Sequence, residues 1–233
     1  MPGGRGLRSR FIGLDVQAAR PCAFAVLDRE GRSVEAGWID PRAELRSALD
    51  TLLDRHPDAA VGIDAPRVPL RAPRPWYWSG SRWRARLPSE RGAGRHCEVV
   101  IKAHGIANPQ WTPLAGSAPE WMKVGFRLFE LLAARVDVYE VFPSASYTLL
   151  QWDPSTRVQM SFEGFRPGPK DMLDSVVAAA TVREFDVGRG ASVGGGDGLG
   201  EIVLPRPLPH PIAGVLRWPG GSGRRKRAAR PAR

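Results

Sequence analysis

The chain has 233 residues and a formal net charge of +10, with 42% hydrophobic and 25% charged residues. These values are typical of one globular domain with a sizeable core and exclude a chain that is disordered throughout. Two cysteines give no disulfide framework, and no apolar run approaches the roughly 18 residues of a membrane span. We therefore expect a soluble, cytoplasmic protein with no membrane partner.

Three β-type runs open the folded part, at 10–16, 22–28 and 33–39, with short polar or turn segments between them. They predict an antiparallel meander. Leucines at helical spacing predict a helix over 41–55, with a proline suited to its first turn, and an apolar run predicts a strand over 61–66.

Residues 67–95 break this pattern, because eight Arg, one acid and four aromatic residues occur there without a sustained period. We expect a long loop or insertion. The mixture of Arg and aromatic side chains is typical of surfaces that bind single-stranded nucleic acid, with Arg82 and Trp83 as candidate contacts. The alternative is an Arg-rich surface loop whose tryptophans pack back on the sheet.

Helices and strands alternate in the second half of the chain. A weak helix signal covers 90–104, and strong amphipathic patterns predict helices over 119–134 and 170–185. Apolar runs predict strands over 136–142, where a Pro-Ser pair ends the run, and 201–205. Strands followed by crossover helices predict the α/β class, a mixed sheet with helices on its faces.

The two ends of the chain differ from the middle. Residues 1–9 are basic and glycine-rich, and 206–233 are first proline-rich and then basic. We expect a flexible N-terminus, one domain over 10–205 and a disordered tail. The tail and the overall charge favour a polyanionic partner such as DNA or RNA, although a solvated Arg-rich tail explains them as well.

Acidic residues recur near the ends of apolar strands. Asp15, Asp64 and Glu140 each lie there, and open α/β sheets bind ligands just beyond the carboxyl ends of their strands. Asp171 and Asp174 are three residues apart on the last long helix and share a face. Taken singly, each acid has a structural explanation, such as a turn, a helix dipole or an ion pair with Arg.

Clustered carboxylates repel one another unless a cation lies between them. Carboxylates suit hard divalent cations, above all Mg²⁺ or Mn²⁺, and two such ions can clamp the attacking and leaving oxygens of a phosphodiester. The acids therefore predict a metal site, with Asp15, Asp64, Asp171 and Asp174 as ligands.

Five motifs resemble, in the expected order, the family called domain of unknown function 429, which is described as predicted nucleases of ribonuclease H-like fold. They are GLDV, IDAP, RHCE, YEVFP and KDMLDSVVAAAT. The resemblance covers roughly residues 10–205. It implies a five-stranded mixed sheet, three antiparallel strands and then two parallel ones, with helices on both faces.

The resemblance also implies roles for single residues. Asp15, Asp64 and Asp174 would bind two metal ions, with Asp171 beside the last. The remaining matches to the family's motifs are acids or cations that would pair with phosphate or carboxylate groups or bind substrate: Arg95, Glu98, Glu140 and Lys170.

The expected function is that of a hydrolase, a metal-dependent nuclease in which water attacks phosphorus at the acidic site and Glu140 or Glu98 orients it. A non-catalytic nucleic-acid-binding protein with a degenerate site is the alternative. A phosphotransferase related to sugar kinases ranks last, because Asp15 is followed by Val-Gln-Ala rather than by phosphate-gripping glycines. A homodimer is compatible with the sequence.

Overall fold

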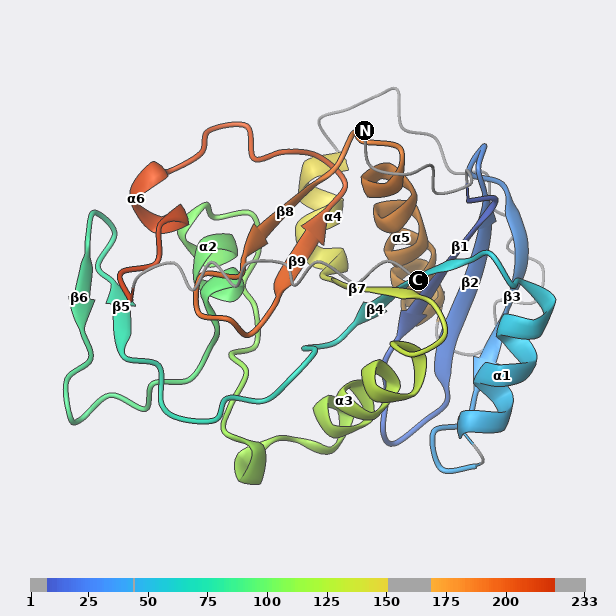
Figure 1. Ribbon diagram of the computed structural model, residues 1–233, viewed down its shortest axis with the longest axis horizontal. Helices are drawn as coiled ribbons and strands as arrows, with labels where there is room; N and C mark the ends of the chain where they lie inside the picture. Colours follow the sequence, from blue (N-terminus) through green and yellow to red (C-terminus); the bar gives the residue numbers. More distant parts are fainter. Residues whose placement is uncertain (1–7, 44, 151–168, 221–233) are drawn as a thin grey trace, which may run out of the picture.

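The computed structural model describes residues 8–43, 45–150 and 169–220. Its core is a seven-stranded sheet in the order β3-β2-β1-β4-β7-β9-β8 (Figure 1). The strands of this sheet are β1 (Arg10–Asp15), β2 (Cys22–Asp28), β3 (Ser33–Ile39), β4 (Ala60–Asp64), β7 (Asp137–Val141), β8 (Ala191–Gly194) and β9 (Glu201–Leu204).

The pairing within the sheet is mixed, as predicted. Strands β1, β2 and β3 form the expected antiparallel meander. Strands β4, β7 and β9 run parallel to β1, and β8 closes the far edge antiparallel to β9. The sheet has two strands more than the five expected. The first of these, β8, lies in a glycine-rich stretch without an apolar run, and the second, β9, is the short strand predicted over 201–205.

Helices cover both faces of the sheet. The helices are α1 (Leu45–Arg55), α2 (His96–Ala103), α3 (Glu120–Leu132), α4 (Pro143–Leu150), α5 (Pro169–Asp186) and α6 (Ala213–Leu216), with a 3₁₀ turn at Ala115–Ser117. Side chains of α1 and α3 pack with Ile12, Val61 and other residues of one sheet face. Helix α5 packs on the other face, against β1, β2 and β4.

Two glycines bring α5 unusually close to the sheet. A Cβ at Gly13 would lie 1.9 Å from the carbonyl oxygen of Ser175, and one at Gly62 would lie 2.6 Å from Val182. Only glycine permits this approach, because any side chain would collide with the helix. The close packing places the first half of α5, which carries Asp174, beside the ends of β1 and β4.

The predicted element bounds match those of α1, α3 and α5 to within about one turn. Helix α4 was missed, because Pro143 was interpreted only as the end of the preceding strand. A proline also fits the first position of a helix, where its missing N–H has no partner to lose, and α4 begins at that residue.

The insertion at 67–95 contains a two-stranded sheet, β5 (Trp76–Trp78) and β6 (Trp83–Ala85), at one end of the molecule (Figure 1). Trp83 packs edge-on against Trp78 and Trp218, with ring centres 5.5 and 5.1 Å apart.

Trp218 belongs to the segment that was expected to be a disordered tail. Residues 206–220 are instead placed against the body of the protein, with Val215 of α6 fully buried, while 221–233 lie outside the described residues. The expected flexible N-terminus falls largely on residues 1–7, which also lie outside them. No helix in the described ranges is long and apolar enough to cross a membrane.

Candidate metal centre

Asp15 and Asp64 are the last residues of two neighbouring parallel strands. They are paired directly across β1 and β4, so their side chains leave the sheet side by side on the same face. Alternation along each strand puts them on the face of Gly13 and Gly62, the face that α5 covers. Two acids at the carboxyl ends of parallel strands therefore come together, as the sequence predicts.

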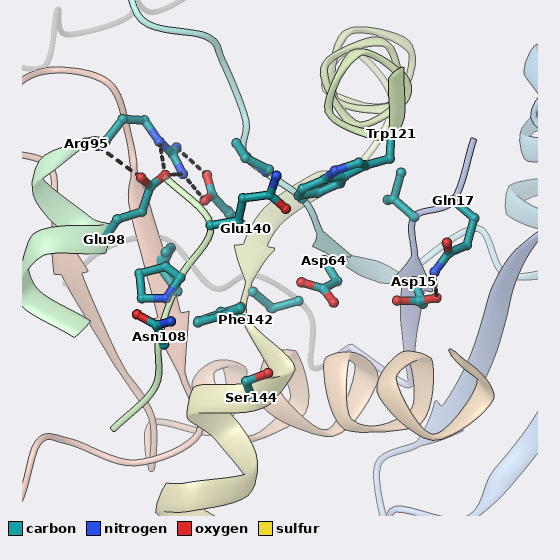
Figure 2. A pocket seen from close by; sticks show the side chains of 17 residues that line it. Asp15, Gln17, Asp64, Arg95, Glu98, Asn108, Trp121, Glu140, Phe142 and Ser144 are labelled. Carbon is teal, nitrogen blue, oxygen red and sulfur yellow. Dashed lines mark hydrogen bonds and ion pairs between the residues drawn. The ribbon is translucent and has the colours of Figure 1, made fainter. Parts of the chain in front are cut away.

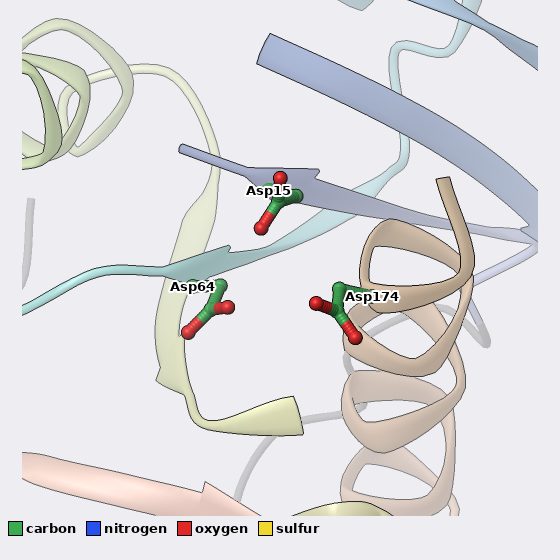
Figure 3. A group of neighbouring side chains, drawn as sticks. All are labelled: Asp15, Asp64 and Asp174. Atoms are coloured by element: carbon green, nitrogen blue, oxygen red, sulfur yellow. The ribbon is translucent and has the colours of Figure 1, made fainter. Parts of the chain in front are cut away.

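Asp174 completes this group from α5. Each of the three aspartates offers a carboxylate oxygen, and these oxygens all lie within 4.8 Å of one another. Figure 3 shows the three carboxylates turned toward a common space from two strands and one helix. We call Asp15, Asp64 and Asp174 the acid triad.

The charges of the acid triad are poorly compensated. Burial raises the pKa of Asp15 to about 6, with added repulsion from Asp171 and Asp174, although a hydrogen bond from Gln17 opposes the rise. Burial and the same kind of repulsion raise the pKa of Asp64 well above its usual value. Like charges held together in a partly dry site make the ionised form costly, so the triad favours a bound cation.

The partners of the acid triad are few. The Gln17 amide donates to Asp15 at 2.9 Å, and the Tyr147 hydroxyl donates to Asp174 at 3.0 Å. The Lys170 ammonium contacts the other oxygen of Asp174, but its side chain is 78% exposed, so the pair is screened by water. No hydrogen bond to the Asp64 carboxylate occurs among the described residues.

Three carboxylates at this spacing fit a hard divalent cation, whose preferred ligands are oxygens. They would supply three of the oxygen ligands of such an ion. One ion fits the spacing of the triad itself.

Asp171, the fourth expected ligand, is not part of the triad. Its Oδ1 accepts a hydrogen bond of 2.9 Å from Arg20, in the turn between β1 and β2. Its Oδ2 is buried and finds no hydrogen-bond donor among the described residues. Asp171 therefore adds negative charge close to Asp15 rather than a fourth oxygen within the triad.

Glu140 lies on the opposite face of the sheet from the triad. It is paired in register with Ile63, whose side chain packs on the α1 and α3 side. Its two oxygens accept hydrogen bonds from the Arg95 guanidinium and, at 2.9 Å, from the backbone N–H of Arg67. Of the two roles predicted for Glu140, the ion pair with Arg fits these contacts better than the catalytic role.

Arg95 joins Glu140 to Glu98, and we call these three residues the Arg95 cluster. Arg95 is 1% exposed and Glu98 2%. The Glu98 carboxylate accepts hydrogen bonds from Arg95 and also from the backbone N–H and hydroxyl of Thr112. Because every carboxylate oxygen here has a donor, the Arg95 cluster builds the pocket wall and has no free oxygen for a substrate or a cation.

A pocket of about 390 Å³ reaches from the acid triad to the Arg95 cluster (Figure 2). Trp121 of α3 and Phe142, just after β7, lie on either side of Asp64 in this view. Further polar groups on its wall were not identified from the sequence: Gln17, Asn108, Gln110 and Ser144. Only Gln17 carried a signal, because it follows Asp15 by two residues.

Two other expected contacts lie elsewhere. Arg82 and Trp83 belong to the β5–β6 hairpin and do not line the pocket of the acid triad. Trp83 packs within the aromatic group of Trp78 and Trp218, and its Nε1–H donates to the carbonyl of Gly214 at 2.9 Å. Its position agrees with the alternative in which the tryptophans of the insertion pack back on the protein.

Comparison with known proteins returned no match: no family model, no curated protein and no solved structure is detectably similar to this chain.

Proposed function

We propose that this protein is a metal-dependent nuclease that hydrolyses phosphodiester bonds of DNA or RNA. The observation that carries the proposal is the acid triad, in which three carboxylates from β1, β4 and α5 offer oxygens within 4.8 Å of one another. Burial and mutual repulsion raise the pKa values of Asp15 and Asp64, so their ionised forms are costly unless a divalent cation such as Mg²⁺ or Mn²⁺ binds.

The arrangement of the sheet supports the assignment to a ribonuclease H-like fold. Its first five positions, β3-β2-β1-β4-β7, hold three antiparallel strands and then two parallel ones, which is the arrangement that the family resemblance implies. Under this assignment, β9 and β8 extend the five-stranded sheet beyond β7. The net charge of +10 supports a polyanionic substrate.

Each residue of the site has a separate task in this proposal. Asp15, Asp64 and Asp174 hold the cation, and the Gln17 amide orients the Asp15 carboxylate. Tyr147 orients Asp174 by donating to its Oδ1. A divalent cation bound there would neutralise charge on the phosphate and lower the pKa of water, whereas Trp121 and Phe142 would exclude bulk water from the pocket.

The alternative, a nucleic-acid-binding protein without catalysis, is favoured by one contact. The Lys170 ammonium already lies against Asp174, so the site has one positive group of its own. Because Glu140 is paired with Arg95 and Asp171 lies outside the triad, only three of the five predicted acids remain to bind two ions. The same assay separates the two functions, because only the nuclease depends on the metal.

The test is the Asp64→Asn variant, compared with Asp54→Asn as a matched control on the exposed face of α1. We expect wild-type protein and the control to cleave labelled DNA or RNA with Mg²⁺ or Mn²⁺ and not with a chelator. Asp64→Asn should lose at least about 100-fold in rate, because it removes a metal ligand. Wild-type rates in Asp64→Asn would overturn the proposal, and metal-independent binding without cleavage would favour the alternative.

A further inference from the structure

A second pocket, of about 860 Å³, lies between the insertion and α2. Its charged lining residues are all basic, and its aromatic lining residues come from β5 and from the segment before the 3₁₀ turn: Arg74, Arg91, Lys102, Tyr77, Trp78 and Trp111. None of its described lining residues is acidic. We call it the Arg74 pocket.

Arg74 is a buried cation that contacts aromatic rings and, among the described residues, pairs with no carboxylate. Only 7% of its surface is exposed, and its guanidinium carbon lies 4.5 Å from the centre of the Tyr77 ring and 5.2 Å from that of Trp111. Its Nε and Nη1 are buried and find no hydrogen-bond acceptor among the described residues. Buried donors without acceptors destabilise a fold, so such an arrangement points to an anion that binds there.

The nearby acids do not fill this role. Glu98 is engaged with Arg95 and Thr112, and Asp197 accepts hydrogen bonds from the backbone N–H groups of His96 and Leu199. Burial lowers the pKa of Arg74, against the opposing influence of Tyr77, Glu98 and Asp197. Arg74 also lines a neighbouring pocket that holds Asp197, and of the two only the Arg74 pocket has no acidic residue in its described lining.

The Arg74 pocket adjoins the pocket of the acid triad. Gln110 lines both. A chain that lies across Gln110 would reach the metal centre with one unit and the Arg74 pocket with another. Basic groups beside half-buried aromatic rings are the combination that holds single-stranded nucleic acid, through phosphates and stacked bases.

We propose that the Arg74 pocket binds one nucleotide of a single strand whose phosphodiester is cut at the acid triad. Arg74, Arg91 and Lys102 hold the phosphate, and the base stacks on the rings of the pocket wall. This inference rests on the proposed nuclease function and names single-stranded nucleic acid as the substrate class. Hydrogen bonds to Nε and Nη1 require Tyr77 or Trp111 to move aside, since neither nitrogen has exposed surface.

The test measures fluorescence anisotropy of a short, labelled single-stranded oligonucleotide with the full chain in a chelator, where no cleavage occurs. Arg74→Met should weaken binding about 10- to 100-fold, the effect of lost hydrogen bonds to a charged group. Arg46→Met is the matched control, because it removes the same charge from an exposed site on α1 outside the pocket, and it should cost about threefold or less.

A second pair of variants protects the test against misfolding of Arg74→Met. Arg91 and Arg46 are both exposed, but only Arg91 lines the pocket. Arg91→Met should therefore weaken binding more than Arg46→Met. Equal losses in the two variants, or wild-type binding by a folded Arg74→Met protein, would overturn the inference. So would Arg74-dependent binding of a nucleoside monophosphate without binding of the oligonucleotide.

The failure of this inference differs from the failure of the proposed function. If the wild-type protein cleaves with metal but Arg74→Met binds and cleaves normally, only the Arg74 pocket is refuted. If Arg74 is needed for binding but no metal supports cleavage, the nuclease proposal fails and the pocket remains a nucleic-acid-binding site.

Discussion

Two acidic clusters line the same pocket and differ in how their charge is balanced. The Arg95 cluster holds two carboxylates around one guanidinium, with further N–H and O–H donors from Arg67 and Thr112. The acid triad holds three carboxylates with a neutral amide, a neutral hydroxyl and one exposed ammonium as partners. The acids are aspartates in one cluster and glutamates in the other, and the donors around their carboxylates differ.

This contrast teaches which acidic residues can serve as ligands. A carboxylate whose oxygens are filled by fixed donors is part of the framework, because moving a substrate or an ion onto it would first break those hydrogen bonds. A carboxylate with spare oxygens that lies beside other carboxylates repels them, and a bound cation relieves that repulsion. Proximity to the pocket alone does not separate the two kinds of residue.

The largest expected effect comes from breaking the Arg95 cluster. Arg95→Met leaves Glu98 and Glu140 buried without their cation, and it should lower the free energy of unfolding by about 3–5 kcal/mol. Urea denaturation measures this loss. Arg82→Met, on the exposed hairpin, should stay within about 0.5 kcal/mol of wild type. An Arg95→Met protein with the unfolding free energy of wild type would show that the Arg95 cluster does not stabilise the fold.

The acid triad should make the protein less stable as the pH rises. Folding raises the pKa of Asp15 from 3.8 to about 6, so between these values the folded chain keeps a proton that the unfolded chain releases. Stability therefore falls as the pH rises through this window. The full difference of about two units corresponds to at most about 3 kcal/mol.

Asp15→Asn removes this pH dependence and should be more stable than wild type above about pH 6 in a chelator. Urea midpoints across the pH range test the expectation, with Asp54→Asn as the control for an exposed acid. If the urea midpoint of Asp15→Asn depends on pH as that of wild type does, the raised pKa of Asp15 is contradicted.

A divalent cation should relieve the repulsion between the carboxylates of the acid triad and so stabilise the fold. It should not act on the Arg95 cluster. At 100 times the dissociation constant, a bound ion raises the free energy of unfolding by about 2.7 kcal/mol. Thermal melts with Mg²⁺ or Mn²⁺, at ionic strength matched with Na⁺, should show the gain in wild type and not in Asp64→Asn. Glu140→Gln, although less stable, should keep the gain. Its loss in Glu140→Gln would place Glu140 in the metal site.

Much of the fold was predictable, because most of its elements carry their own periodicity. The helix at Glu120–Leu132 shows a continuous apolar stripe, and β1 and β2 are apolar runs bounded by polar links. Strand β8, helix α4, the β5–β6 hairpin and helix α6 were not predicted. Glycines obscure the period of β8, and Pro143 was interpreted as a stop although it also fits a first helical position.

The candidate site was predictable only in part. Four aspartates were predicted as metal ligands, and the structure brings three of them together, Asp15, Asp64 and Asp174, but not Asp171. Glu140 has the same local signature as Asp64, an acid near the end of an apolar strand. Which face each side chain takes depends on strand register, and Ile63 rather than Asp64 is the partner of Glu140. No pattern in the sequence predicted that Nε and Nη1 of Arg74 would be buried without hydrogen-bond acceptors.

The sequence by itself determined the α/β class and most of the elements, which follow from local periodicity and residue type. It also offered several acids for the site, and the family resemblance singled out the three that form the acid triad. Only the tertiary structure decided which acids are neutralised and which are not. Arg95 precedes Glu98 by three residues, but the donors to Glu140 come from distant segments. A carboxylate becomes a framework group or a ligand through the atoms that fold against it, and a local pattern contains only some of them.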